Sequence, residues 1–144
     1  MEAGEAIARV EIRTVAERYF AAVDASDGPL LASCFAESFR FELDLQPPRV
    51  ITSHDEVRAF LSEPRPAAST HALGNMDIAL DGDRARSVIN AVIHVLTAPG
   101  GTVLNRGLRY TDKWVRQNGK WLITERVHKL RWHYDHPAKD MPGT

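Results

Sequence analysis

The first half of the chain carries a hydrophobic pattern with the period of an α-helix. Between about residues 6 and 25, apolar side chains recur every three or four positions, which gathers them on one face of a helix. A short second helix is predicted over residues 29–35, because Asp27 is a suitable cap and Pro29 is tolerated in a first turn. The predicted inward face of the first helix consists of Ile12, Val15, Ala16, Tyr19, Phe20 and Val23.

A third helix is predicted where a capping-box pattern precedes another apolar spacing. Ser53 and Glu56 stand three positions apart, so each side chain can bind a free backbone amide at the start of a helix. The helix should run to about residue 62, because Pro64 and Pro66 follow it and break the chain.

The remaining segments have the two-residue period of β-strands. Residues 39–45 alternate strictly between apolar and polar side chains, so one face of this strand is expected to be buried. Turns with glycine at residues 81–83 and 118–119 predict tight hairpins between long strands. The expected strands of this antiparallel meander cover about residues 69–80, 84–97, 103–116 and 120–134.

This order of elements predicts an α+β fold, with three N-terminal helices packed on a strongly curved, mostly antiparallel sheet. A long sheet that is covered on one side tends to curl, and its concave face would then enclose a pocket. We expect residues 1–144 to form a single domain, with loose tails at residues 1–5 and 138–144.

Composition and charge narrow the classes of function. The sequence has 144 residues, of which 26% are charged, and its formal net charge is -1 without a long basic run. A nucleic-acid partner is therefore not expected, because such proteins carry a clustered basic surface. The single cysteine, Cys34, lies in an apolar run and is expected to be buried. An acidic N-terminus and the lack of a long apolar stretch favour a cytoplasmic protein without a membrane partner.

Five short segments, spread over nearly the whole chain, are informative in combination. Residues 22–27 and 30–35 end the first helix and follow it, residues 70–75 open the long meander, and residues 110–116 and 120–126 flank a hairpin. In their order and spacing the chain resembles the SnoaL-like family, which has the nuclear-transport-factor-2-like fold. The resemblance implies a cone-shaped α+β barrel. Ketosteroid isomerase, polyketide cyclases and proteins that only bind ligands share this fold, so the fold alone names no reaction.

Individual positions resemble the dehydratase and dehydrochlorinase members of that family. These members have an Asp near the end of the first helix, a His at the start of the second strand and a cation on the last strand. Asp24, His71 and Arg126 match those places. Bile-acid dehydratase members add a Tyr five residues before the Asp, as Tyr19 is here, and scytalone dehydratase has a second pocket His near the position of His94. The resemblance implies an elimination or isomerisation of a small, largely apolar, cyclic substrate.

These residue types suit the removal of a proton from carbon. Imidazole accepts a proton near neutral pH when one ring nitrogen is free, so His71 is the candidate general base. A carboxylate on the other nitrogen fixes the tautomer and stabilises the imidazolium, which is the role expected for Asp24. Arg126 and Tyr19 are expected to bind the substrate oxygen or the leaving group. The residues expected at substrate-binding positions are Phe41, Asn90, His94, His128 and Trp132.

Other functions and another base stay open at this point. Asp24 could itself be the base, as in polyketide cyclases, or the chain could be a non-catalytic module for ligand binding or assembly. Arg40, Glu42 and Asp44 share one face of the first strand, and a carboxylate there could be the base if that face lines the pocket.

Neither a metal nor an organic cofactor is expected. The histidines near the C-terminus, His128, His133 and His136, have no cysteine or ordered carboxylate set beside them that would complete a metal site. No glycine-rich phosphate loop is present in the sequence. The expected partners are a small-molecule substrate or ligand and further copies of the chain, in a dimer or a trimer.

Overall fold

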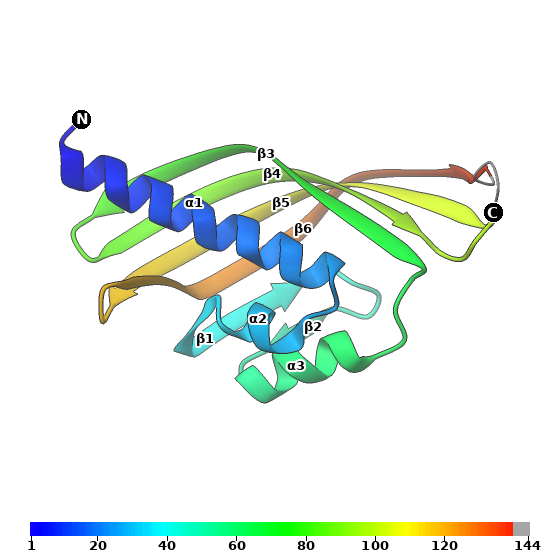
Figure 1. Cartoon of the computed structure of the whole chain (residues 1–144), viewed down its shortest axis with the longest axis horizontal. Coiled ribbons are helices and arrows are strands. Elements are labelled where there is room, and N and C mark those ends of the chain that lie inside the picture. The colour runs from blue at the N-terminus through cyan, green and yellow to red at the C-terminus, as the bar shows by residue number, and fades with distance from the viewer. Residues whose placement is uncertain (140–144) are drawn as a thin grey trace.

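The structure is a computed structural model and describes residues 1–139. Short and long elements follow one another in the order shown in Figure 1. The helices are α1 (Ala3–Asp24), α2 (Gly28–Ala32) and α3 (His54–Ser62). The strands are β1 (Phe35–Leu43), β2 (Arg49–Ile51), β3 (Ala68–Asp81), β4 (Arg84–Leu96), β5 (Thr102–Gln117) and β6 (Lys120–Pro137).

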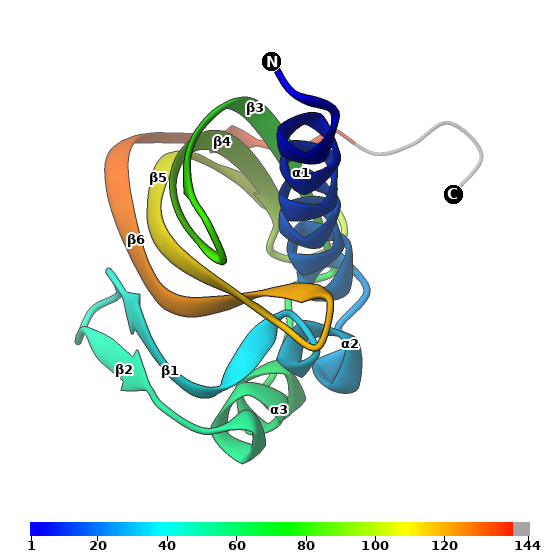
Figure 2. The ribbon, with the colours of Figure 1, turned by 90° about the vertical axis from the view of Figure 1, so that its left-hand side faces the viewer.

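The strands form one 6-stranded sheet in the order β2-β1-β6-β5-β4-β3. Every neighbouring pair is antiparallel except β1 and β6, which run parallel. The end-on view shows a strongly curved sheet that does not close, with α1 along its open side (Figure 2). The predicted α+β architecture is confirmed, and the hydrophobic core lies between the concave face and the helices.

The helices have the faces and caps that the sequence predicts. Every residue of the predicted inward face of α1 is buried. The Asp27 carboxylate accepts the Leu30 amide at 3.0 Å, and Ser53 Oγ accepts the Glu56 amide at 3.1 Å, so both predicted caps are confirmed. Helix α2 is shorter than expected, because Phe35 already belongs to β1.

The predicted tails differ from the observed chain. Helix α1 begins at Ala3, inside the segment 1–5 that was expected to be loose. At the other end, the Ala138 amide donates a hydrogen bond of 2.8 Å to the Gly101 carbonyl, so the predicted tail is attached there. Residues 140–144 of that tail lie outside the described residues.

Strand β1 was predicted only in part. It starts at Phe35, pairs in parallel with β6, and is joined on its other edge by the short β2, which the periodicity did not indicate. A parallel pair needs a long connection and leaves no hairpin signature in the sequence. As a result of this pairing, the end of β1 lies beside the middle of β6, where Leu43 is opposite His128.

A β-bulge changes the face on which the end of β6 presents its side chains. Gly107 pairs with Trp132 and Leu108 with Leu130, so Arg131 is an extra residue in β6. An extra residue reverses the alternation beyond it. Trp132 therefore lies on the outer face of the sheet, across Gly107, where a Cβ on the glycine would stand 2.0 Å from the Trp132 ring.

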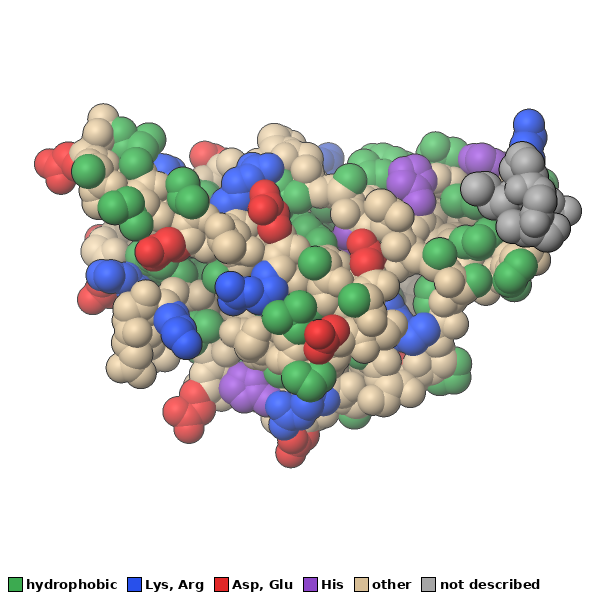
Figure 3. Space-filling view, viewed as in Figure 1, with side chains coloured by type: hydrophobic (Ala, Val, Ile, Leu, Met, Phe, Trp, Pro, Cys, Tyr) green, Lys and Arg blue, Asp and Glu red, His purple; other side chains and the backbone are tan. Residues whose placement is uncertain are grey.

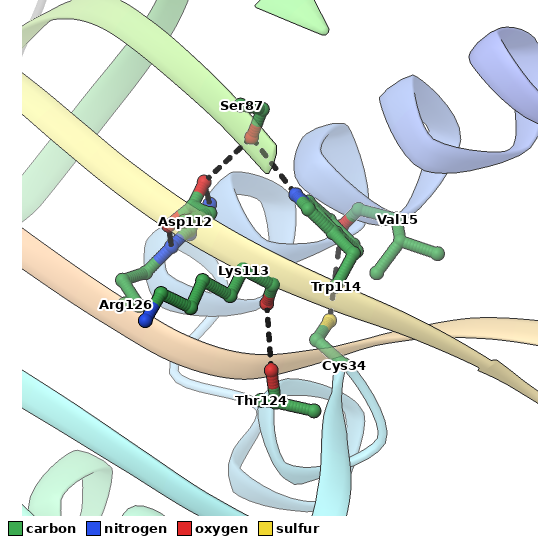
Figure 4. Close-up of polar contacts among 8 residues, drawn as sticks. All are labelled: Val15, Cys34, Ser87, Asp112, Lys113, Trp114, Thr124 and Arg126. Carbon is green, nitrogen blue, oxygen red and sulfur yellow. Dashed lines mark hydrogen bonds and ion pairs between the residues drawn. The ribbon is translucent and has the colours of Figure 1, made fainter. Parts of the chain in front are cut away.

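A polar network crosses the buried interior of the sheet. Nε and Nη2 of Arg126 each donate a hydrogen bond of 2.8 Å to the Asp112 carboxylate, and both side chains are fully buried. Ser87 donates to the same carboxylate at 3.2 Å, and the indole N–H of Trp114 donates to Ser87 at 2.8 Å. Figure 4 shows these side chains converging from three adjacent strands. A paired charge is tolerated inside a protein only when it is hydrogen-bonded in this way.

The surface carries charges of both signs. Acidic and basic side chains alternate over the face seen in Figure 3, without a large patch of one sign. None of the helices within residues 1–139 is both long enough and apolar enough to cross a bilayer.

Loss of the buried ion pair should destabilise the fold strongly. Replacing Asp112 by Asn keeps its shape but leaves the Arg126 charge buried without a counter-charge, which should lower the free energy of unfolding by about 3 kcal/mol or more. Urea unfolding of the two proteins measures the loss. The control is Asp83→Asn, because Asp83 pairs with Arg116 at the surface across 3.9 Å and its loss should cost under about 0.5 kcal/mol. Equal losses in the two variants would contradict this account of the core.

Candidate active site

A cavity of about 230 Å³ opens on the concave side of the sheet, between the end of β1, α3 and strands β3 to β6. Most of its lining is apolar, and a few polar groups converge on it, as in typical small-molecule sites. The lining residues are Tyr19, Leu43, Asp44, Leu45, Phe60, His71, Ile93, Val95, Leu104, Arg106, Leu108, Tyr110, His128 and Leu130.

His71 and Asp24 form a hydrogen-bonded pair at one wall of this cavity. Nδ1 of His71 lies 2.6 Å from Oδ1 of Asp24, and the His71 amide donates to Oδ2 at 2.8 Å. Ser69 Oγ donates to Oδ1 at 2.8 Å. The imidazole stacks on the Phe20 ring at 5.5 Å between centroids, and its side chain is 5% exposed against 25% for Asp24. Among residues 1–139, no hydrogen bond uses Nε2 of His71.

The environment fixes the protonation states of this pair. Burial raises the pKa of Asp24, but the hydrogen bonds from His71 and Ser69 outweigh burial and lower that pKa below its ordinary range. Burial, together with the positive charge of Arg65, lowers the pKa of His71 by more than the Asp24 carboxylate raises it. Asp24 is therefore ionised and His71 neutral at pH 7. Because the carboxylate accepts a hydrogen bond from Nδ1–H, the lone pair of His71 is on Nε2.

Two tyrosines form the floor of the cavity, and a buried arginine lies behind them. The Arg126 guanidinium lies 4.2 Å from the centroid of the Tyr19 ring and 4.6 Å from that of Tyr110. Burial raises the pKa of Tyr19 to about 12 and that of Tyr110 well above its ordinary value, so both hydroxyls stay protonated at neutral pH. Burial opposes the charge of Arg126, but the ion pair with Asp112 outweighs it and raises the Arg126 pKa.

Arg126 does not occupy the place expected for a substrate ligand. It is fully buried behind the two tyrosines, and it is not among the residues that line the cavity. Its position on the inner face of β6 agrees with the predicted alternation, but the rings of Tyr19 and Tyr110 separate its charge from the cavity.

His128 lies in the same cavity, held by the end of β1. The Asp44 amide donates a hydrogen bond of 3.1 Å to Nδ1 of His128, and the Asp44 carboxylate accepts the Leu130 amide at 3.0 Å. The imidazole packs edge-on against Tyr110, with 5.3 Å between the centroids. Burial lowers the pKa of His128 to about 4, although the Asp44 carboxylate acts in the opposite direction.

Four other predicted site residues lie away from this cavity. His94 bonds to Asn105 at 2.6 Å and Asn90 to Asn75 at 3.1 Å, both on the outer face of the sheet. The cavity-lining residues of β4 are instead those of opposite parity, Ile93 and Val95. Trp132 lies on the outer face beyond the bulge, where it is 47% exposed. Phe41 is fully buried in the core, 5.9 Å from the Tyr19 ring.

The three charged residues at the end of the first strand do not all face the same side. Arg40 and Glu42 form a surface ion pair of 2.8 Å, while Asp44 turns inward and lines the cavity beside His128. Sequence reasoning did not single out Tyr110 or Arg106, which also line the cavity. The pairing of Tyr110 with His128 across β5 and β6 would have indicated that Tyr110 lines the same cavity as His128. This pairing follows only from the register of the hairpin, which the sequence did not give.

Larger hollows occur elsewhere on the surface, including one of about 340 Å³ between α1 and the start of β6 that Arg18 and Trp121 line. Neither His71 nor His128 borders it. Within residues 1–139, no group of three or more His, Cys, Asp or Glu side chains is arranged to hold a metal ion. Both histidines line the 230 Å³ cavity.

The chain is similar to known proteins in family and in fold. Residues 4–127 match the SnoaL-like domain family. A hexachlorocyclohexane dehydrochlorinase (LinA, type 2) is similar in structure, with a TM-score of 0.86, 13% identity and 97% of each chain covered. A proposed scytalone dehydratase from Novosphingobium aromaticivorans has a TM-score of 0.80 and 15% identity, covering 97% of this chain and 96% of its own. No curated protein matches the chain in sequence.

A protein of unknown function from Mycobacterium tuberculosis is similar at a higher identity. It shares 25% identity and a TM-score of 0.78 over 89% of this chain and 74% of its own. The first two structures are only 13% and 15% identical to this chain, so their similarity shows the fold alone. That fold agrees with the three helices and the curved sheet described above.

Acid should destabilise the folded protein through His128. Its pKa is about 4 in the folded state against an ordinary value of 6.5, so between these values the unfolded chain binds a proton that the folded protein does not. From pH 7.5 to pH 5, His128 should therefore remove about 2 kcal/mol of stability. Urea unfolding at both pH values gives the change in the free energy of unfolding between them. This change should be about 2 kcal/mol smaller in His128→Gln than in the wild type. Leu130→Ala, at the same cavity but without a titrating group, should keep the full dependence. A His128→Gln variant with wild-type pH dependence would contradict the assignment.

Proposed function

The chain belongs to the SnoaL-like family, and we propose that it is a small-molecule lyase or isomerase in which His71 is the general base. The observation that carries this proposal is the His71–Asp24 pair, with Nδ1 bound to the carboxylate at 2.6 Å and Nε2 left to the cavity. A base must present a free lone pair to the substrate, and it must be neutral at the working pH. His71 meets both requirements.

The reaction begins with the transfer of a proton from a substrate carbon to Nε2 of His71. The imidazolium that forms carries its charge next to the ionised Asp24, which stabilises it without taking the proton. Negative charge meanwhile develops on a substrate oxygen or a leaving group. Tyr19 and Tyr110 supply protonated hydroxyls at the floor of the cavity to bind it. Return of the proton to another carbon gives isomerisation, and departure of a group from the neighbouring carbon gives elimination.

Arg126 contributes indirectly in this proposal. Its guanidinium lies against the faces of Tyr19 and Tyr110, where a cation is attracted to the aromatic rings and holds them in place. We therefore assign it a positioning role rather than contact with the substrate. The small, mostly apolar cavity supports a compact substrate, such as a single ring with a carbonyl, hydroxyl or halide group.

The alternatives have less support. Asp24 as the base would need a free carboxylate oxygen, but Oδ1 accepts from His71 and Ser69 and Oδ2 accepts from the His71 amide. A purely structural module would be favoured by a filled interior. The open cavity, with a lowered His71 pKa and a hydrogen-bonded carboxylate beside it, supports catalysis instead.

Substitutions in the dyad should abolish turnover and leave the fold intact. We expect His71→Ala to lower kcat at least about 100-fold on any substrate found among small cyclic ketones, alcohols and halides, because a general base contributes about 10²–10⁴ in rate. Steady-state kinetics and proton exchange into deuterated water are the measurements. His94→Gln is the matched control, since this histidine lies on the outer face and should keep activity within about twofold.

The pH profile of kcat/KM tests the role of Asp24 separately. Because the carboxylate raises the pKa of His71, Asp24→Asn should move the acid limb of the kcat/KM profile to lower pH as well as reduce the rate. Full activity in His71→Ala would end the general-base proposal. Failure of Asp24→Asn together with an active His71→Ala would instead identify Asp24 as the base.

We also propose that the chain forms a homo-oligomer through the outer face of its sheet. Val88, Trp132 and Tyr134 are 37%, 47% and 53% exposed there, and exposed apolar groups gathered on one surface favour association. Light scattering should find a dimer or trimer for the wild type and a smaller species for Tyr134→Lys. Val10→Lys, on the exposed side of α1, should leave the mass unchanged. A monomeric wild type would refute the proposal.

A further inference from the structure

The orientation of His128 points to a second reactive group in the cavity. We propose that His128 is a neutral hydrogen-bond donor that binds the oxygen of an uncharged carbonyl substrate through Nε2–H. This assignment rests on the proposed function of His71 and deepens it, because it names the substrate class.

The tautomer of His128 follows from its partner. A backbone amide can only donate, so the 3.1 Å contact between the Asp44 amide and Nδ1 requires a lone pair on Nδ1. A neutral imidazole has one proton, which must then be on Nε2. A protonated ring would set one N–H against another and lose this bond. Within residues 1–139 no hydrogen bond occupies Nε2, and the ring lines the cavity.

The two cavity histidines are thereby held in opposite tautomers. Nδ1 of His71 donates to a carboxylate, which leaves Nε2 as an acceptor, whereas Nδ1 of His128 accepts from an amide, which leaves Nε2–H as a donor. An acceptor and a donor on one small cavity are the two groups that enolisation needs, one for the C–H proton and one for the oxygen.

The charged and titratable groups around His128 keep it neutral during the reaction. Asp44 faces it from the end of β1, His71 from β3, Tyr110 from β5 and Arg126 from its own strand. Burial is the main cause of its low pKa, and positive charge on Arg126 and on His71 lowers the pKa further, against Asp44. Protonation of His71 by the substrate thus makes His128 harder to protonate, so it remains a hydrogen-bond donor.

The lining of the cavity indicates an uncharged substrate. Its formally charged side chains are Asp44 and Arg106. Arg106 is paired with Asp135, its Nη1 lying 2.5 Å from the carboxylate, and so it is compensated. An anionic substrate would meet the Asp44 carboxylate without a free cation among the lining residues. A neutral carbonyl compound suits a neutral N–H donor.

Enolisation of the carbonyl substrate moves two electron pairs. The C–H pair of the carbon next to the carbonyl forms a C=C bond as its proton passes to Nε2 of His71. The π pair of the C=O bond moves to the oxygen, which accepts the His128 hydrogen bond and becomes an enolate. Collapse of the enolate re-forms the C=O bond. The C=C pair then either takes the proton back from Nε2 of His71 at a carbon, or forms a new C=C bond as a leaving group departs from the next carbon with its bonding pair. In the second case Nε2 gives its proton to the departing group or to water, which restores neutral His71.

Acetophenone labelled with ¹³C at the carbonyl tests this role directly. The infrared carbonyl stretch reports the hydrogen bond at the oxygen, and exchange of the methyl protons in deuterated water reports the base. Nitrogen-15 NMR of the labelled protein reads the tautomer of each histidine. We expect a bound carbonyl with a lowered stretching frequency and His128 protonated on Nε2.

Variants of His128 test the hydrogen bond to the carbonyl oxygen separately from the base, His71. His128→Phe should lose most of the frequency shift and bind acetophenone about tenfold more weakly, the worth of one hydrogen bond. His128→Gln also loses the imidazole but keeps an N–H donor, and it should retain the shift. Its shift would show that the loss in His128→Phe comes from the missing hydrogen bond and not from a folding defect. His94→Gln should behave as the wild type.

The other possible results test His128 as the donor and His71 as the base. A proton on Nδ1 of His128, a carbonyl band unchanged by His128→Phe, or no binding of acetophenone to the wild type would overturn the proposal. Loss of methyl exchange in His71→Ala with an intact carbonyl shift is the expected division of labour. A normal carbonyl shift without any exchange in the wild type would support His128 as a donor and count against the general base.

Discussion

The buried ion pair between Arg126 and Asp112 is the constraint around which this molecule is built. It joins β5 to β6, and through Ser87 it reaches β4 and the indole of Trp114. Two charges inside a core cost several kcal/mol to desolvate, so such a pair persists only with compensating hydrogen bonds, here those from Nε and Nη2 of Arg126 to Asp112. The guanidinium lies within 4.6 Å of the ring centroids of Tyr19 and Tyr110, which supports the proposed positioning role of Arg126. The floor of the cavity thus depends on a charge that never enters it.

Burial also determines which groups at the cavity can donate a proton and which can accept one. It raises the pKa of the tyrosines and lowers that of the two histidines, so all four groups are neutral at pH 7. Asp24 is the exception, because it is 25% exposed and accepts three hydrogen bonds from protein groups. A charged carboxylate beside a neutral histidine is the arrangement that the proposed removal of a proton from carbon requires.

Local sequence patterns predicted the parts of this structure that depend on local interactions. The apolar face of α1, the cap at Asp27 and the capping box at Ser53 require only residues close in sequence. The pairing of Asp24 with His71, 47 positions apart, came from family resemblance and not from periodicity. His94 and Trp132 were expected in the pocket and lie outside it for two different reasons. For His94 the choice between two equivalent faces of β4 was wrong, and for Trp132 a bulge at Arg131 reversed the alternation.

The parallel pairing of β1 with β6 explains why His128 could be expected at a substrate-binding position from sequence while its tautomer could not be predicted. His128 owes its tautomer to the amide of Asp44, a residue 84 positions away that only this pairing brings near. His71 owes its tautomer to Asp24 at the end of α1. Each histidine is therefore oriented by an element other than its own strand, one by the long helix and one by the first strand. Docking of α1 and β1 onto the meander therefore completes the site, because the Asp24 carboxylate and the Asp44 amide reach the two histidines only in the assembled fold.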